Sequence, residues 1–335
     1  MITIVQPGLF TTIQDKGRVG FQKFGVPVSG AMDIDAHRIA NLLVGNDENS
    51  ATIEMTIQGT EMKLEQDALV AFFGRGPTLR TNSRELPHGR PHFLSKGSIV
   101  KHAFTGSGAR SYMAVAGGIN VPIIMDSRST YTRASFGGHE GRRLAKGDQL
   151  EIGKLTTEQE KILQFIKETG TDHLVTWFVP SQFFDSDVPN NTIQIIKNEQ
   201  LETFTIESQN ALLARPFTVT SQSDRMGYRL EGAELSKKSS KNEISSAVPF
   251  GTIQVPPDGN PIILLADRQT TGGYPIIGYT ASIDRHKLAQ MKPGDKLYFE
   301  SIDVEEAQEQ FFLKEEAIRQ VKAGIKLRLK GLKKK

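Results

Sequence analysis

Residues 261–275 read PIILLADRQTTGGYP, an apolar run that stops abruptly in polar residues and glycines. A short apolar run bounded by turn residues is typical of a buried strand. Polar groups then gather at one strand end, where glycines let backbone N–H groups approach a ligand. This predicts a site for an anionic or amide substrate, built from Asp267, Arg268, Gln269, Thr270, Thr271, Gly272, Gly273 and Tyr274. The alternative is an ordinary strand followed by a tight turn.

The apolar run and strand end within 261–275 have a counterpart earlier in the chain. The run ending at Arg268 resembles the run ending at Arg75, 193 residues before it. Further pairs of similar phrases follow in the same order at offsets of 191 to 194 residues: Ile2–Val5 with Ile193–Ile196, Ser29–Asp33 with Ser223–Gly227, and Gly59–Thr60 with Gly251–Thr252. Each half also closes on a related phrase, at 147–152 and at 294–299. Such an ordered series indicates two copies of one domain.

Short apolar or alternating runs separated by turn residues fill both halves, which is typical of a mainly β fold built from barrels or sandwiches. The clearest strands are expected at Ile2–Val5, Ala68–Phe73, Ser111–Ala116, Thr176–Val179, Ile193–Ile196, Phe217–Ser221 and Ile262–Ala266. Few helices are expected, at Ile34–Leu43 after the cap candidate Asp33, and at Thr157–Glu168, Glu199–Leu213 and Val304–Val321.

These patterns predict four regions along the chain. The first β domain covers 1–153 and carries an insertion between Arg75 and Gly147, and a helical linker follows at 154–172. The second β domain covers 173–301, and a C-terminal helix with a basic tail covers 302–335.

Composition narrows the class of protein. The chain has 335 residues, of which 38% are hydrophobic and 24% charged, as in globular proteins with two ordinary domains. It contains neither an apolar run of about 20 residues nor the pattern of a signal peptide, so we expect a cytoplasmic protein without membrane contact. The absence of cysteine excludes disulfides, thiolate metal sites and a cysteine nucleophile.

The net charge of +3 comes from the end of the chain. Lys322–Lys335 holds seven basic residues and no acid, which leaves 34 basic and 38 acidic residues elsewhere. Nucleic-acid binding needs a basic face on the folded body, and none is indicated.

Charged turns supply further candidate residues. In the second half, the turn 223–229 contributes Asp224, Arg225, Tyr228 and Arg229. Two arginines four residues apart can grip a carboxylate or phosphate, although a surface network of Arg and Asp would have the same pattern. In the first half, the comparable residues are Gln14, Asp15, Arg18, Arg128 and Arg133, near a glycine-rich loop at 137–143. General-base candidates are Asp15, Glu140, Asp224 and Asp267.

Several familiar sites are missing from the sequence. It has no Gly-x-x-x-x-Gly-Lys-Ser/Thr loop for a nucleotide, no His-Glu-x-x-His zinc motif and no Gly-x-Ser-x-Gly elbow. His88 and His92 lie in one Pro-rich loop without other ligands. We therefore predict no metal site in this chain.

Five phrases together resemble one known family. They are GLFTTIQDKGR at 8–18, GVPVSGAMD at 25–33, SRSTY at 127–131, SDRMGY at 223–228 and DRQTTGGYP at 267–275. They resemble the biotin-dependent carboxyltransferase family, also called allophanate hydrolase subunit 2, over about residues 2–299. Within it, the chain looks closest to the free-standing C subunit of bacterial 5-oxoprolinases.

The resemblance implies two tandem cyclophilin-like β-barrels, in agreement with the duplication. It also implies a hetero-oligomer in which this chain contacts the B subunit directly and works with the A subunit, opening 5-oxo-L-proline to L-glutamate while ATP, expected with Mg²⁺, is consumed. The biotin attachment phrase Ala-Met-Lys-Met is absent from the sequence, so no biotin is expected on this chain.

ATP makes an unstrained lactam reactive by phosphorylating the amide oxygen, a step that needs cations and hydrogen-bond donors. The hypothesis for this chain is that Arg268 and Arg225 bind anionic groups. Gln269 and Thr270 would assist them. Asp267 or Asp224 would orient the substrate or a metal-bound nucleotide.

Two other functions fit the same resemblance. One is a regulatory protein whose capture of a sister subunit relieves the inhibition of a histidine kinase. The other is a carboxyltransferase acting on urea or another amide with a separate biotin carrier.

Overall fold

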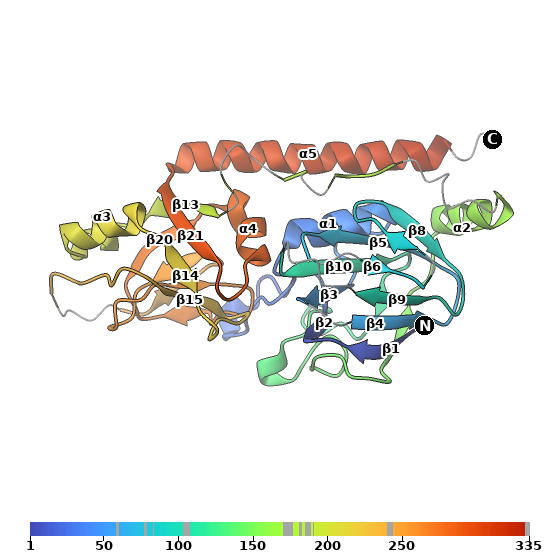
Figure 1. Ribbon diagram of the computed structural model, residues 1–335, viewed down its shortest axis with the longest axis horizontal. Helices are drawn as coiled ribbons and strands as arrows, with labels where there is room; N and C mark the ends of the chain where they lie inside the picture. The colour runs from blue at the N-terminus through green and yellow to red at the C-terminus, as the bar shows by residue number, and fades with distance from the viewer. Residues whose placement is uncertain are drawn as a thin grey trace. The chain divides into compact units, whose positions relative to one another are not determined.

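The computed structural model describes the chain except residues 58–59, 77–78, 83, 103–107, 170–176, 181–182, 185–188, 190, 240–243 and 332–335. The chain forms two compact units, each made of segments that are discontinuous in sequence (Figure 1). Unit 1 comprises 1–17, 33–184 and 316–335, and unit 2 comprises 18–32 and 185–315. The predicted limits of the two sequence copies stay a prediction, because these units follow packing and not sequence similarity.

Unit 1 contains two antiparallel sheets. One has the order β11-β12-β1-β4-β9-β6-β7 and the other β2-β3-β10-β5-β8. The strands are β1 (Ile2–Pro7), β2 (Phe10–Gln14), β3 (Thr52–Thr56), β4 (Thr60–Leu64), β5 (Ala68–Gly74), β6 (Leu79–Arg80), β7 (Glu85–Leu86), β8 (Pro91–Leu94), β9 (Ile99–His102), β10 (Arg110–Val115), β11 (Ile119–Asn120) and β12 (Gln149–Ile152). Alternate residues such as Ile4, Ile53 and Phe72 form its apolar core.

Unit 2 is a closed barrel of seven strands in the order β13-β20-β17-β18-β15-β14-β21. Its strands are β13 (Thr192–Lys197), β14 (Phe217–Val219), β15 (Gly227–Glu231), β17 (Thr252–Gln254), β18 (Ile262–Leu264), β20 (Ile276–Thr280) and β21 (Lys296–Ser301), and a separate two-stranded sheet joins β16 (Ser246–Ala247) to β19 (Thr271–Gly272). Inward residues such as Ile195, Ile253 and Leu297 fill the barrel, and Met32 joins the same core.

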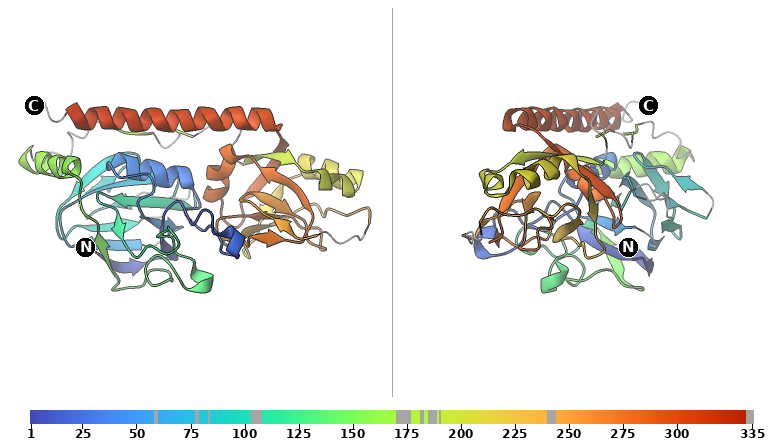
Figure 2. Two further views of the ribbon diagram at one scale, coloured as in Figure 1. Left: turned by 180° about the vertical axis from the view of Figure 1, so that it is seen from behind. Right: turned by 60° about the vertical axis from the view of Figure 1, so that its left-hand side comes forward.

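The helices are α1 (Ile34–Leu43), α2 (Thr157–Thr169), α3 (Ile206–Ala214), α4 (Arg285–Gln290) and α5 (Val304–Gly331). Short 3₁₀ turns lie at Gln22–Phe24, Thr132–Ala134, Glu199–Thr203 and Ser282–Asp284. Helix α1 packs on β5 and β10, as Figure 1 and the view from behind in Figure 2 show. The Asp33 side chain caps it by accepting from Ala36 N at 3.0 Å, as the sequence predicts.

The prediction of a mainly β chain with few helices and a C-terminal helix is confirmed. The single helix expected at Glu199–Leu213 is wrong, because Phe204 is buried in an extended conformation between a 3₁₀ turn and α3. Thr205 then starts α3 by accepting from Ser208 N, at 3.2 Å. At the strand expected at Thr176–Val179, Thr176 lies outside the described residues and Trp177–Val179 are not in a strand. The tail at 332–335 also lies outside them.

Candidate functional site

The strand-end segment of unit 2 begins with a buried ion pair. Arg225 Nε donates to Asp267 Oδ2 at 2.9 Å and its Nη2 to Oδ1 at 3.2 Å, a two-bond fork between planar groups. Arg225 Nη2 also donates to Gly30 O at 2.6 Å. The structure therefore brings together two residues that the sequence singles out, and it pairs them with each other.

Arg268 follows this pair and binds backbone carbonyls. Its Nε donates to Val248 O at 2.9 Å and its Nη1 to Leu265 O at 3.1 Å. Burial lowers the pKa of this guanidinium to about 10, with nearby Arg285 adding to the shift and Asp267 opposing it. Arg268 is still cationic at neutral pH, and two of its three nitrogens hold the local backbone.

The rest of the segment runs outward. Gln269 and Thr270 are half-buried, Thr271 and Gly272 form β19 against β16, and Gly273 and Tyr274 are exposed. Gln254 Nε2 holds the Tyr274 carbonyl at 3.1 Å. The polar groups predicted as one site are therefore spread from a buried strand end to an exposed two-stranded sheet.

The turn 223–229 divides its residues between surface and core. Asp224 is exposed, and its Oδ1 accepts from Met226 N at 2.7 Å as in an Asx turn. Arg229 is exposed on β15. Tyr228 lies in the barrel core and donates its hydroxyl to Met291 O at 3.0 Å. This position gives Tyr228 a packing role.

In unit 1, the predicted residue Asp15 is buried at the centre of a hydrogen-bonded loop cluster. Its carboxylate accepts from Gly17 N at 2.8 Å, from the Ser127 hydroxyl at 2.7 Å, from the Ser129 hydroxyl and from Arg128 N. A carboxylate that accepts four hydrogen bonds holds together the loops that supply the donors. This arrangement uses Asp15 as a structural acceptor.

The other predicted residues of the first half have different surroundings. Arg128 Nε donates to Val121 O at 3.2 Å. Arg133 is exposed on a 3₁₀ turn. Arg18 is fully buried and belongs to the segment 18–32 of unit 2. Gln14 belongs to a larger cluster of buried polar residues.

One face of the five-stranded sheet is lined with buried polar residues. The register places Gln14 opposite Thr52, and it places Glu54 between Thr12 and Tyr112. Helix α1 adds His37, whose Nδ1 lies 2.8 Å from Thr52 Oγ1. We call this set, comprising Thr12, Gln14, His37, Thr52, Glu54 and Tyr112, the polar face; all six side chains are buried.

The polar face has a hydrogen-bond chain and two unused atoms. Tyr112 donates its hydroxyl to Glu54 Oε2 at 2.7 Å and accepts from Asp33 N at 2.8 Å. Gln14 Oε1 and His37 Nε2 are buried and have no well-aligned hydrogen-bond partner among the described residues, although the backbone of Glu48 interacts with the His37 imidazole. A buried polar atom without a partner is costly, and such atoms are found where a water or ligand binds.

Burial also shifts the acid–base properties of this face. It lowers the pKa of His37 to about 4, with the Asp15 carboxylate opposing the shift, so the imidazole is neutral at physiological pH. It raises the pKa of Tyr112, and the nearby carboxylate of Glu54 adds to that shift. Groups with strongly shifted pKa values, beside buried polar atoms that lack a well-aligned hydrogen-bond partner, are candidates for a functional site.

The sequence patterns do not single out His37, Thr52, Glu54 or Tyr112 as site residues. The available signal was the alternation Thr52-Ile53-Glu54-Met55-Thr56, which puts polar residues on one side of a strand. That alternation is also typical of a strand with one face in water, and only the packing of α1 turns this face inward.

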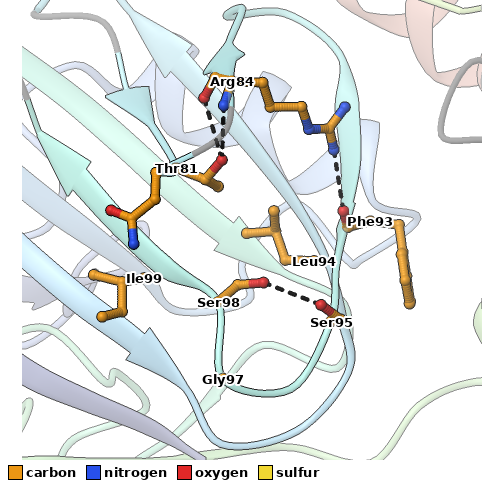
Figure 3. A pocket seen from close by; sticks show the side chains of 9 residues that line it. Thr81, Arg84, Phe93, Leu94, Ser95, Gly97, Ser98 and Ile99 are labelled. Atoms are coloured by element: carbon orange, nitrogen blue, oxygen red, sulfur yellow. Dashed lines mark hydrogen bonds between the residues drawn. The ribbon is translucent and has the colours of Figure 1, made fainter.

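A separate surface pocket of about 320 Å³ lies in unit 1, between the β6–β7 hairpin, β8 and β9 (Figure 3). Its one charged lining residue is Arg84, whose Nη2 donates to Phe93 O at 3.3 Å. None of the residues predicted from the sequence lines this pocket.

The described part of the chain offers neither a metal cluster nor a membrane-spanning helix. There, no three His, Asp or Glu side chains come together as a metal site would require. None of the helices that the structure describes is long and apolar enough to cross a membrane.

Comparison with known proteins gives the family. The sequence model of the carboxyltransferase domain, subdomains A and B, matches residues 24–301. The chain belongs to this family. It is 37% identical to the C subunit of 5-oxoprolinase from Escherichia coli, over 92% of this chain and 93% of that protein.

Larger enzymes contain relatives of the same domain. Urea amidolyase of Saccharomyces cerevisiae is 29% identical over 91% of this chain, but the match spans only 17% of the yeast protein. The solved structure of K. lactis urea amidolyase superposes with a TM-score of 0.84 over 96% of this chain and 20% of that protein, at 24% identity. This similarity confirms the fold of the carboxyltransferase family.

Proposed function

We propose that this chain is the C subunit of an ATP-dependent 5-oxoprolinase, which opens 5-oxo-L-proline to L-glutamate together with the A and B subunits. The similarity to the E. coli protein of that name, along nearly the whole of both chains, supports the assignment. The chain would act only within the assembled enzyme.

The observation that carries the choice of site is the pair of unused atoms on the polar face. A lactam offers one N–H donor and one carbonyl acceptor. The polar face offers the amide oxygen of Gln14 and the imidazole Nε2 of His37, neither of which has a well-aligned hydrogen-bond partner among the described residues. Arg225 and Asp267 already pair with each other, and Arg268 already binds two carbonyls. We therefore place the substrate amide at the polar face and keep Arg268 as the alternative anion site.

Activation of the lactam requires hydrogen-bond donors that point at the amide oxygen, where negative charge develops. A neutral His37 bearing its proton on Nε2 would donate to the amide oxygen without adding a buried charge, and Gln14 Oε1 would accept from the ring N–H. We place ATP and its Mg²⁺ with the assembled complex, because the described acids and histidines of this chain do not fit a metal ion.

The test is glutamate formation by three purified subunits, with each left out in turn. Within that system, His37→Asn should lower kcat/KM by about 100-fold, as loss of one donor to a developing oxyanion does. The matched control is His92→Asn, since His92 is also buried with its pKa lowered to about 4, but its Nε2 already pairs with Pro87 O. Full activity without this chain would refute the function; equal effects of the two variants would refute only the site.

A carboxyltransferase that uses a separate biotin carrier is the second candidate. The relation to the urea amidolyases favours it. Transfer of a carboxyl group from a carboxybiotin carrier to urea, with no ATP-dependent glutamate formation, would establish this function in place of the first. Capture of a kinase-inhibiting sister subunit stays a prediction of the sequence.

A further inference from the structure

Helix α5 follows the residues that the family's sequence model matches. It runs from Val304 to Gly331, whereas the family match ends at 301. At 1.5 Å per residue its 28 residues extend over about 42 Å. Ala307, Lys314, Ile318 and Ile325 are buried, at spacings of seven, four and seven residues. This stripe packs the helix against its own chain.

The opposite side of α5 is exposed along its described length. At 100° per residue, this side carries Glu309, Phe312, Glu316, Arg319, Ala323, Lys326 and Leu327, all of them exposed. Phe312 is 63% exposed and Leu327 69% exposed. We call these seven residues the outer stripe. Exposed large apolar side chains such as Phe312 and Leu327 are typical of a surface that contacts another protein segment.

The charges of the outer stripe are segregated along the helix. Its acids, Glu309 and Glu316, come first, and its bases, Arg319 and Lys326, come second. Glu316 and Arg319 already form an exposed ion pair at 3.0 Å within the helix. A parallel copy of this stripe would oppose like charges, whereas an antiparallel copy opposes acids with bases.

One antiparallel register satisfies charge and shape together. With a two-fold axis passing between residues 317 and 318, Glu309 faces Lys326 of the second copy and Glu316 faces Arg319. The same register sets the large Phe312 against the small Ala323, so a ring on one helix meets a gap on the other. Because the axis is two-fold, every contact occurs twice.

From this complementarity we propose that the outer stripe of α5 is an interface with a second copy of this chain, packed antiparallel. The proposal is independent of the enzymatic function. The ion pairs are exposed, so association should weaken as salt is added.

The test uses charge reversal and sedimentation velocity of the full chain, from about 1 to about 100 µM at low salt. Glu309→Lys alone and Lys326→Glu alone should each weaken association at least tenfold. In either homodimer, residues 309 and 326 then carry the same charge at both of their contacts. An equimolar mixture of the two variants should dimerise again, since both contacts in the heterodimer become attractive. The double variant should dimerise as the unaltered chain does.

Glu207→Lys, at an exposed position of α3, makes the same charge change away from α5 and should leave association unchanged. A monomeric unaltered chain at about 100 µM overturns the proposal, and so does a mixture that stays monomeric. If Glu309→Lys impairs only the binding of a sister subunit, the stripe is a hetero-interface and the proposal is also wrong.

Discussion

His37 links the candidate site to the pH dependence of folding. Burial lowers its pKa to about 4, whereas an unfolded histidine titrates near 6.5. Between these values the unfolded chain binds the proton more strongly, so stability is complete above pH 6.5 and falls as the pH drops toward 4. The two pKa values give a loss of about 2 kcal/mol from this group between pH 7 and pH 5.

Urea unfolding at pH 7 and pH 5 tests this prediction. His37→Asn should show a smaller loss of stability on acidification than the unaltered chain, by about 2 kcal/mol. His92→Asn should flatten the profile in the same direction, because burial lowers the pKa of His92 as well. An NMR titration that finds His37 protonating near its ordinary pKa would contradict the proposed neutral imidazole.

Residue types in the sequence indicate chemistry but not the partners of each side chain. Asp15, Arg225 and Asp267 were predicted as ligand-binding or catalytic groups, and all three are buried. Asp15 instead collects donors from its own loops, and the other two form a fork with each other. A charged residue that binds a substrate and one that pairs with a neighbouring turn can lie in the same sequence pattern. Only the packing of the folded chain distinguishes the two roles.

The Arg225–Asp267 fork joins three segments of unit 2. It links the turn before β15 to the turn after β18, and Arg225 also holds Gly30 O of the segment 18–32. Replacing Asp267 by Asn leaves the Arg225 guanidinium buried with its charge uncompensated. The free energy of unfolding should then fall by about 3 to 5 kcal/mol.

A double-mutant cycle distinguishes a structural ion pair between Arg225 and Asp267 from an anion-binding site. Arg225→Met together with Asp267→Leu removes both charges, and the double variant should be more stable than the sum of the two single losses predicts. Additive losses in urea unfolding would mean that each residue acts through other contacts. A different outcome, in which the single variants keep their stability and lose only turnover, would support the anion site instead.

Local signals predict elements well and their pairing poorly. Helix α1 has the predicted bounds because Asp33 caps it and its apolar period is clear. The related phrases at 147–152 and 294–299 both contain strands, β12 and β21. However, β12 pairs antiparallel with β1, whereas β21 pairs parallel with β13. Strand direction depends on the path of the intervening chain, which similar short phrases do not encode.

The polar face could not be predicted for the same reason. It requires the register of β2, β3 and β10, the packing of α1 on β10 and the contact of His37 with Thr52. Each strand alone indicates only a half-polar surface. The fold class follows from patterns that repeat along the chain, whereas the site depends on contacts between segments that lie far apart in sequence.

The chain alternates between its two units, and this has consequences for folding. Segment 18–32 belongs to unit 2 and places Met32 in the barrel core, while 316–335 belongs to unit 1. In unit 1, Lys322 binds Glu48 at 2.8 Å. Burial alone would raise the pKa of Glu48, but hydrogen bonds from Lys322 and Arg38 lower it to about 2. Each unit therefore depends on a segment that a cut between the sequence halves would remove.

We predict that neither half folds when made alone. A fragment covering 185–335 lacks Met32 and the Gly30 carbonyl, and a buried methionine contributes about 2 to 5 kcal/mol relative to alanine. A fragment covering 1–184 lacks Lys322 and exposes Met32. Near-UV circular dichroism should show no fixed tertiary structure in either fragment, and a single cooperative transition in the intact chain. Mixing the two fragments should restore the near-UV signal, because together they supply every segment of both units. A folded 185–335 fragment with the stability of the intact barrel would show that Met32 and Gly30 are dispensable to it.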